Sequence, residues 1–257
     1  MRKTVKTEQL QPGKRGFLKN LLGVGAAATV IPIKPVSAGI NDQPPRRPGI
    51  EGTRYGMVIE LRKCIGCQAC TVACTMENLP PIGQFRTTVL QYEVDDYDGA
   101  PAMFNLPRLC NHCENPPCVP VCPVQATFQR DDGIVLVDSE RCVGCAYCVQ
   151  ACPYDARFIN HETNTADKCT FCEHRLVAGL LPACVETCVG GARIIGDLND
   201  PNSIVSQLLT EYKDEIKVLK PDMNTAPRVF YIGMPDEFVD GVEGQASVRL
   251  VAEIAEL

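Results

Sequence analysis

The chain has 257 residues, of which 16 are Cys, 15 are Phe or Tyr and none is Trp, so large aromatic side chains cannot dominate its core. Residues 1–38 hold seven Lys or Arg and one Glu, which leaves a net charge of −12 on residues 39–257. A body this acidic, without a stripe of Lys and Arg, is a poor partner for nucleic acid, and we exclude that class of function.

Residues 1–38 predict an export signal. A basic stretch precedes the weakly polar run Leu21–Ile33, which is followed by the small-x-small sequence Val36-Ser37-Ala38. This run is too short to span a bilayer. Lys14-Arg15-Gly16-Phe17-Leu18-Lys19 resembles the twin-arginine signal, with Lys14 in place of the first arginine. Because that route exports folded proteins, we expect the chain on the periplasmic side of the cytoplasmic membrane, attached through partner subunits.

Short β-rich segments and turn residues fill the rest of the chain. Residues 39–53 are rich in Pro, Arg and Gly and predict an extended arm. We expect strands at Tyr55–Leu61, Thr87–Tyr92, Ile134–Asp138, Arg157–Asn160, Arg193–Ile195 and Arg228–Ile232. Glu93–Asp98 is expected to be an acidic loop, residues 200–212 a helix and Met234–Leu257 an acidic tail.

The sixteen cysteines fall into four groups of four, with none left over. The first and third groups share the spacing C-x2-C-x2-C-x3-C, the second is C-x2-C-x4-C-x3-C and the fourth is C-x2-C-x11-C-x3-C. In chain order the groups are Cys64, Cys67, Cys70, Cys74; Cys110, Cys113, Cys118, Cys122; Cys142, Cys145, Cys148, Cys152; and Cys169, Cys172, Cys184, Cys188.

These spacings favour iron–sulfur clusters over other thiol chemistry. C-x2-C-x2-C-x3-C is the bacterial ferredoxin spacing, in which three thiolates bind one [4Fe–4S] cluster and the fourth binds the other cluster of a pair. Zinc ribbons need two separated C-x2-C pairs, which only the fourth group approximates. A disulfide scaffold would need awkward local bridges, repeated in four groups. The sequence therefore predicts four [4Fe–4S] clusters.

Ferredoxin geometry also predicts which groups exchange ligands. The second and third groups are separated by a hairpin with the turn Asp132-Gly133 and form one two-cluster module, so the first and fourth groups pair across it. The predicted fold is α+β, with an inner module (residues 101–159) inserted in an outer split module (54–100 and 160–200), followed by an extension (201–257). The expected ligand sets are Cys64, Cys67, Cys70, Cys188 (set 1); Cys74, Cys169, Cys172, Cys184 (set 2); Cys110, Cys113, Cys118, Cys152 (set 3); and Cys122, Cys142, Cys145, Cys148 (set 4).

A cation precedes each group, and all three histidines lie in the cluster region. The four cations, Lys63, Arg108, Arg141 and Lys168, either offset the anionic clusters and raise their potentials or serve as solvated strand-end charges. His112 and His174 echo the spacing of Rieske ligands, but with all four thiols present in each group we expect ordinary hydrogen-bonding roles. No phosphate loop, nucleophile elbow or dinucleotide fingerprint is present, so we expect no catalytic residue.

Four segments carry a family resemblance. They are Arg62–Cys74, Pro107–Cys113, Pro123–Arg130 and Cys184–Gly196, the last with Val189 where many relatives have proline. With eleven residues between the second and third cysteines of the last group, the chain resembles the four-cluster electron-transfer subunits of molybdopterin oxidoreductases of the dimethyl-sulfoxide-reductase type. Within that family it is similar to the iron–sulfur subunits of tetrathionate reductases.

The resemblance implies an electron relay without bond chemistry of its own. A quinol-oxidising integral membrane anchor would supply electrons, which pass through the four clusters to a molybdopterin catalytic subunit that reduces tetrathionate to thiosulfate. The chain itself would contact no substrate. By the same resemblance, the cluster of Cys64 and Cys188 lies nearest the catalytic subunit, and that of Cys122 and Cys142 nearest the anchor.

Two other functions remain open at this stage. The partner enzyme could instead reduce polysulfide, thiosulfate or a sulfoxide, because an electron carrier never touches the terminal acceptor. The chain could also be a free-standing exported polyferredoxin, although the export signal and the large additions at both ends argue against an independent shuttle.

Overall fold

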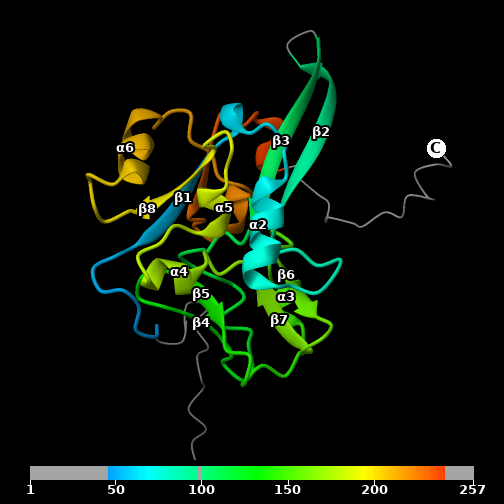
Figure 1. Ribbon diagram of the computed structural model, residues 1–257, viewed down its shortest axis with the longest axis vertical. Coiled ribbons are helices and arrows are strands. Elements are labelled where there is room, and N and C mark those ends of the chain that lie inside the picture. The colour runs from blue at the N-terminus through cyan, green and yellow to red at the C-terminus, as the bar shows by residue number, and fades with distance from the viewer. Residues whose placement is uncertain (1–45, 98–99, 241–257) are drawn as a thin grey trace, which may run out of the picture. The chain divides into compact units, whose positions relative to one another are not determined.

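The computed structural model describes residues 46–97 and 100–240 (Figure 1). The predicted export signal, the first part of the predicted arm and residues 241–257 lie outside this range. Within the described residues, no helix combines the length and the apolar character needed to cross a membrane.

Small sheets and short helices make up the described residues, in agreement with an α+β fold. The elements are β1 (Tyr55–Glu60), η1 (Leu61–Lys63), α2 (Ala69–Asn78), β2 (Thr87–Tyr97), β3 (Ala100–Leu109), β4 (Thr127–Gln129), β5 (Val135–Val137), α3 (Tyr147–Gln150), β6 (Arg157–Asn160), β7 (Thr165–Lys168), α4 (Glu173–Val177), α5 (Ala183–Glu186), β8 (Arg193–Asp197), α6 (Ile204–Glu211), η2 (Pro221–Met223), β9 (Val229–Ile232) and α7 (Glu237–Asp240).

A three-stranded sheet joins the two ends of the described residues. Its central strand, β1, is antiparallel to β8 and parallel to β9, so that Val58 lies opposite Ile194 on one side and Phe230 on the other. Val58 is fully buried and packs with Val205 of α6 and with Ile232. The predicted strands at these positions are confirmed, and so is the predicted helix at 200–212, which begins later than expected, at Ile204.

The remaining strands form three antiparallel hairpins, β2–β3, β4–β5 and β6–β7. The expected acidic loop at Glu93–Asp98 is wrong for Glu93–Tyr97, which continue β2 opposite Ala100–Met103 of β3. This hairpin extends away from the other elements (Figure 1). Its strands are held by backbone hydrogen bonds to each other, which do not require apolar side chains. The acidic composition of Glu93–Tyr97 therefore did not indicate a strand. The β2–β3 and β6–β7 hairpins each cross an expected boundary between the two modules.

The arm and the C-terminal segment both pack against the cluster region. Arg47 pairs along the β4–β5 hairpin, and its guanidinium lies 3.8 Å from the ring centre of Phe128. The predicted acidic tail is wrong for its first residues, because Met234 and Phe238 are buried. The Phe238 ring lies 5.1 Å from that of Tyr92. The burial of these two apolar side chains holds the start of this otherwise acidic segment against the core.

Candidate iron–sulfur sites

Every cysteine group opens with the same backbone turn. The second residue after the first cysteine has a positive φ in all four groups: Gly66 (70°), His112 (42°), Gly144 (68°) and Phe171 (54°). Turns of this kind aim successive N–H groups at one point and make the concave nests found around iron–sulfur clusters. Because glycine adopts this conformation freely, the sequence marks the turn only in the first and third groups.

Two of the four predicted sets each surround a single cavity. The four thiols of set 1 line a cavity together with Val89, Pro107 and Arg193. Those of set 3 line a second cavity with Val135, Tyr154 and Arg157. In both cases one thiol comes from a group distant in the sequence, Cys188 in set 1 and Cys152 in set 3. The fold therefore brings together thiols that the exchange pattern assigns to one cluster.

In the other two sets, contacts link some of the cysteines in pairs. In set 2 the Asn78 amide lies between the sulfurs of Cys74 and Cys172, at 3.5 and 3.7 Å. Burial raises the pKa of the Cys74 thiol to about 12, and the nearby thiols of Cys184 and Cys172 add to this effect. In set 4, Cys142 and Cys148 pack in one apolar cluster. The membership of Cys122 and Cys145 in that set stays a prediction from the spacing.

Two apolar clusters link the sets. One contains Cys70 of set 1, Cys169 and Cys184 of set 2, and Cys110 and Cys113 of set 3, and the other contains Cys118 of set 3 and Cys148 of set 4. Three pairs of neighbouring cysteines lie between successive sets: Cys70 with Cys184, Cys110 with Cys169, and Cys118 with Cys148. In the first two pairs burial raises the pKa of the second thiol, and the first thiol adds to that rise. In the third pair the two cysteines share an apolar cluster. These neighbours therefore place the sets in the order 1, 2, 3 and 4.

The two ends of this row reach the surface. Cys67 of set 1 and Cys145 of set 4 are exposed, whereas all four cysteines of set 2 are buried. Ile65 and Val189 are exposed beside set 1, and Val143 is exposed beside set 4. These exposed apolar side chains leave both ends of the row accessible to another protein.

Some of the cysteine sulfurs accept backbone N–H groups, and others are buried. Backbone N–H groups donate to Cys122, Cys142 and Cys188, at 3.2 to 3.3 Å from Ala126, Ala166 and Ala192. Burial raises the pKa of Cys118 to about 11. At half-buried Cys122 burial opposes ionisation, but the hydrogen bonds from Thr127 and Ala126 outweigh it and lower the pKa. Iron stabilises the thiolate form of both kinds of cysteine. In the described residues no His, Cys, Asp or Glu side chains are grouped to hold a single metal ion. A [4Fe–4S] cluster does not need such a group, because each of its four cysteine ligands binds a different iron atom.

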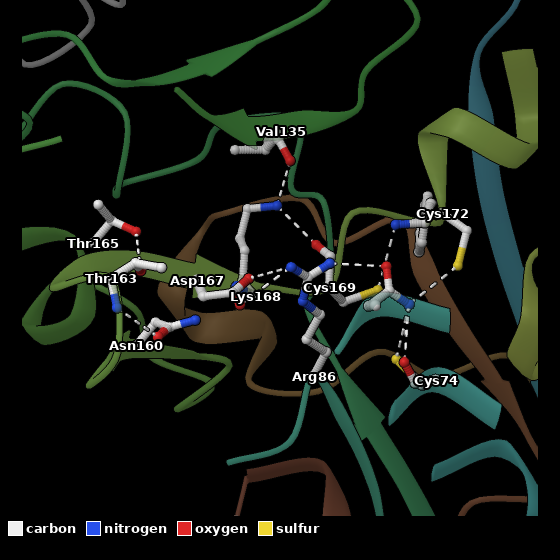
Figure 2. A network of polar contacts seen from close by, with 12 residues as sticks. Cys74, Arg86, Val135, Asn160, Thr163, Thr165, Asp167, Lys168, Cys169 and Cys172 are labelled. Carbon is white, nitrogen blue, oxygen red and sulfur yellow. Dashed lines mark hydrogen bonds and ion pairs between the residues drawn. The ribbon is translucent and has the colours of Figure 1, made fainter. Parts of the chain in front are cut away.

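Three buried cations stand among these thiols. Lys168, Arg157 and Arg193 are at most 3% exposed, and no ion pair found among the described residues includes them. Figure 2 shows the Lys168 amine reaching the carbonyl oxygens of Val135 and Cys169. Burial alone would lower the pKa of Arg157, but the nearby cysteines, Cys118 foremost, outweigh it and raise the pKa. A buried cation requires a counter-charge, which anionic clusters would provide.

Arg157 and Arg193 also have unused donors. Arg157 Nη2 and Arg193 Nη1 are buried and have no protein hydrogen-bond partner in the described part of the sequence. The sequence interpretation missed both residues, although a signal was present: Ala-Arg follows Cys152 and Cys188 at the same spacing, C-x3-Ala-Arg. Each arginine opens the strand after its group, β6 or β8, and so faces back toward the cysteines.

The four cations that precede the groups divide into two kinds. Arg108 and Lys168 are buried, which fits charges that act on the clusters. Lys63 and Arg141 are exposed, which fits the alternative of solvated strand-end charges. The hypothesis of a common role for all four is therefore too broad.

His112 and His174 each have a hydrogen-bond partner through one ring nitrogen, whereas the buried His112 Nε2 has none among the described residues. His112 Nδ1 accepts from the Val135 N–H at 3.1 Å, and burial holds the pKa of His112 well below its usual range. His174 Nε2 lies 2.8 Å from a carboxylate oxygen of Glu77.

Comparison with known proteins agrees with this site. Two family models, both described as a 4Fe–4S dicluster domain, match residues 63–126 and 101–198 and together cover all sixteen cysteines. The chain is 60% identical to the B subunit of tetrathionate reductase from Salmonella typhimurium, over 95% of this chain and 98% of that protein. It is 45% identical to the tetrathionate reductase B subunit of Archaeoglobus fulgidus (71% and 84% covered) and 41% identical to the corresponding B polypeptide of polysulfide reductase from Wolinella succinogenes (70% and 94% covered). The chain therefore belongs to the family of 4Fe–4S dicluster B subunits that includes those of tetrathionate and polysulfide reductases.

Proposed function

We propose that the sixteen cysteines hold four [4Fe–4S] clusters in the four predicted ligand sets and that the chain relays electrons between partner subunits. The observation that carries this proposal is that cysteines of sets 1, 2 and 3 share one apolar cluster and cysteines of sets 3 and 4 share another, while Cys67 of set 1 and Cys145 of set 4 are exposed. Buried middle sets and exposed end sets suit a path with one donor and one acceptor. The clusters supply the redox chemistry, and the protein sets their spacing and charge.

The relatives, which are B subunits or chains of reductases, support partner subunits for this chain. We propose that an integral membrane anchor oxidises quinol and delivers electrons to set 4, and that a molybdopterin catalytic subunit takes them from set 1. The exposed apolar residues at each end, Ile65 and Val143 among them, provide contact surfaces for two proteins. This chain contributes no catalytic residue to the reaction. The 60% identity to a tetrathionate reductase B subunit supports tetrathionate as the terminal acceptor.

Purification from the native host tests this function. The complex is captured anaerobically through this chain, given electrons from a reduced dye, and offered tetrathionate, thiosulfate, polysulfide, a sulfoxide and nitrate in parallel. We expect a molybdopterin subunit in the complex and turnover with tetrathionate. Turnover with polysulfide or a sulfoxide instead would keep the relay but replace the enzyme, and an isolated iron–sulfur protein without turnover would favour a free-standing polyferredoxin.

We also propose that residues 1–38 direct the folded, cluster-loaded chain through the twin-arginine route to the periplasmic side of the cytoplasmic membrane. The basic stretch around Lys14 and Arg15 supports this route. Replacing both residues with Gln is expected to leave the cluster-loaded protein in the cytoplasm. Periplasmic holoprotein from that variant would contradict the assignment.

A further inference from the structure

Asn78, the last residue of α2, contacts sulfur atoms from two different cysteine groups. Its amide nitrogen lies 3.5 Å from Cys74 Sγ and 3.7 Å from Cys172 Sγ, and it also donates to the Cys74 carbonyl oxygen at 3.1 Å. Both cysteines belong to set 2. A primary amide has two N–H donors for these three acceptors, so the two sulfurs and the carbonyl oxygen share them, and one side chain reaches both thiolates.

Arg86 fixes the direction of this amide. Its Nη1 donates to the Asn78 carbonyl oxygen at 2.9 Å, and its Nη2 lies 2.9 Å from a carboxylate oxygen of Asp167. Figure 2 shows Arg86 held between Asp167 on one side and the region of Cys74 and Cys172 on the other. A flipped amide would aim its NH2 group at the guanidinium and its oxygen at the sulfurs. The ion pair therefore selects the orientation in which the N–H donors face the thiolates.

We propose that Asn78 sets the reduction potential of the set 2 cluster, and that Arg86 is a positioning residue that acts through Asn78. Hydrogen bonds to ligand sulfur withdraw negative charge, which favours the reduced cluster and raises its potential. The proposal rests on the proposed function only in assuming that set 2 holds a cluster. It assigns to Asn78, which is not an iron ligand, control over the reduction potential of one of the four clusters.

The decisive variant is Asn78→Leu, which keeps the size of the side chain and removes both donors without adding charge. In a redox titration of the whole complex followed by electron paramagnetic resonance, we expect one of four midpoint potentials to fall and the other three to stay. The transition that moves should be the one altered by Cys74→Ser. A titration in which all four potentials keep their wild-type values, or all move together, would overturn the proposal.

Arg86→Lys separates positioning from charge, because it keeps the positive charge and loses the planar fork. We expect it to lower the same potential in the wild-type background and to cause no further change in the Asn78→Leu background. An equal fall in both backgrounds would show that Arg86 acts directly on the cluster. Arg86→Lys also keeps the test available if Asn78→Leu loads fewer clusters.

Asn160→Asp is the matched control. Asn160 uses only its carbonyl oxygen, which accepts the N–H groups of Glu162 and Thr163 at 3.0 Å, so Asp preserves these contacts. Its potentials should equal those of the wild type. Failure of the proposed function is recognised by a separate measurement. The iron content of the unmodified complex is determined before any variant is made, and fewer than about 16 iron atoms in each copy of this protein would contradict the four-cluster assignment.

Discussion

His112 and Phe171 stack with their ring centres 3.8 Å apart, although one belongs to the second cysteine group and the other to the fourth. Both are buried, and both hold the positive φ that glycine holds in the other two groups. His112 stands between two set 3 cysteines and Phe171 between two set 2 cysteines. The stack therefore joins the two loops between which an electron would pass from one module to the other, and it supports two backbone conformations that are costly for side chains.

Removing the Phe171 ring should loosen this junction. Phe171→Ala leaves a cavity at a site that is 1% exposed, and large-to-small changes of this kind cost about 3–5 kcal/mol. We expect the cluster absorbance to bleach faster in guanidinium under anaerobic conditions. Phe128→Ala, a change of equal size at a half-buried ring under Arg47, should have a smaller effect. Equal bleaching rates in the two variants would contradict a special role for the stack.

The buried amine of Lys168 should matter more than the exposed one of Lys63. Lys168 donates to the Cys169 carbonyl oxygen at 2.8 Å, between sets 2 and 3. Because a nearby positive charge stabilises the reduced cluster, Lys168→Met should make the potentials of the two middle clusters more negative. Lys63→Met should leave all potentials unchanged, since solvent screens an exposed charge. A redox titration of both variants checks this, and equal shifts would refute it.

Removal of iron should unfold the hairpins around the clusters earlier than the rest of the protein. The apolar cluster that contains Val119, Val135 and Ala166 also contains Cys118 and Cys148, so without iron it loses its cross-links. Arg157 would at the same time lose its counter-charge. We therefore expect the amides of β4–β5 and β6–β7 to exchange rapidly after chelation, as measured by hydrogen–deuterium exchange with mass spectrometry.

The internal control for this experiment is the packing of α6 on β1. The apolar cluster of Val58, Val205 and Ile232 includes no cysteine, so its amides should retain more protection. Anaerobic reconstitution with iron and sulfide should restore protection in the hairpins. Native protection throughout the chelated protein would show that clusters do not support the fold.

The direction of the relay can be tested at its ends. Cys145→Ser should block turnover driven by quinol but spare turnover driven by a dye that donates nearer the catalytic subunit. Cys67→Ser at the opposite end should reduce both activities, because all electrons leave through set 1. Assays of the purified complex with the two donors distinguish these outcomes. Equal loss of both activities in Cys145→Ser would reverse or remove the proposed polarity.

Much of the site could be predicted from the sequence because ligand spacing is local. The turn at Gly66 and the strand at Arg157–Asn160 each follow from a few adjacent residues. Long-range pairings were harder to predict. The parallel pairing of β1 with β9 joins residues far apart in the sequence, and neither strand carries a pattern that names its partner.

Buried charge was the other source of error. Arginine is usually a surface residue, and the burial of Arg157 and Arg193 is explained only by their position next to the thiols. Their shared spacing after a cysteine was visible in the sequence, but its meaning depends on a counter-charge that sequence alone does not place. Similarly, an asparagine at the end of a helix is usually exposed to solvent, so nothing in the sequence singles out Asn78. Its contacts with Cys74 and Cys172 form only because the fold brings the first and fourth cysteine groups together.

The most direct test of the four-cluster relay is a Mössbauer spectrum of the anaerobically isolated complex, labelled with ⁵⁷Fe, together with an iron count for this chain. The account predicts that all of its iron is in [4Fe–4S] clusters, at about 16 iron atoms per chain. A three-iron cluster, fewer than four clusters, or zinc in place of iron in any of the four cysteine sets would contradict it.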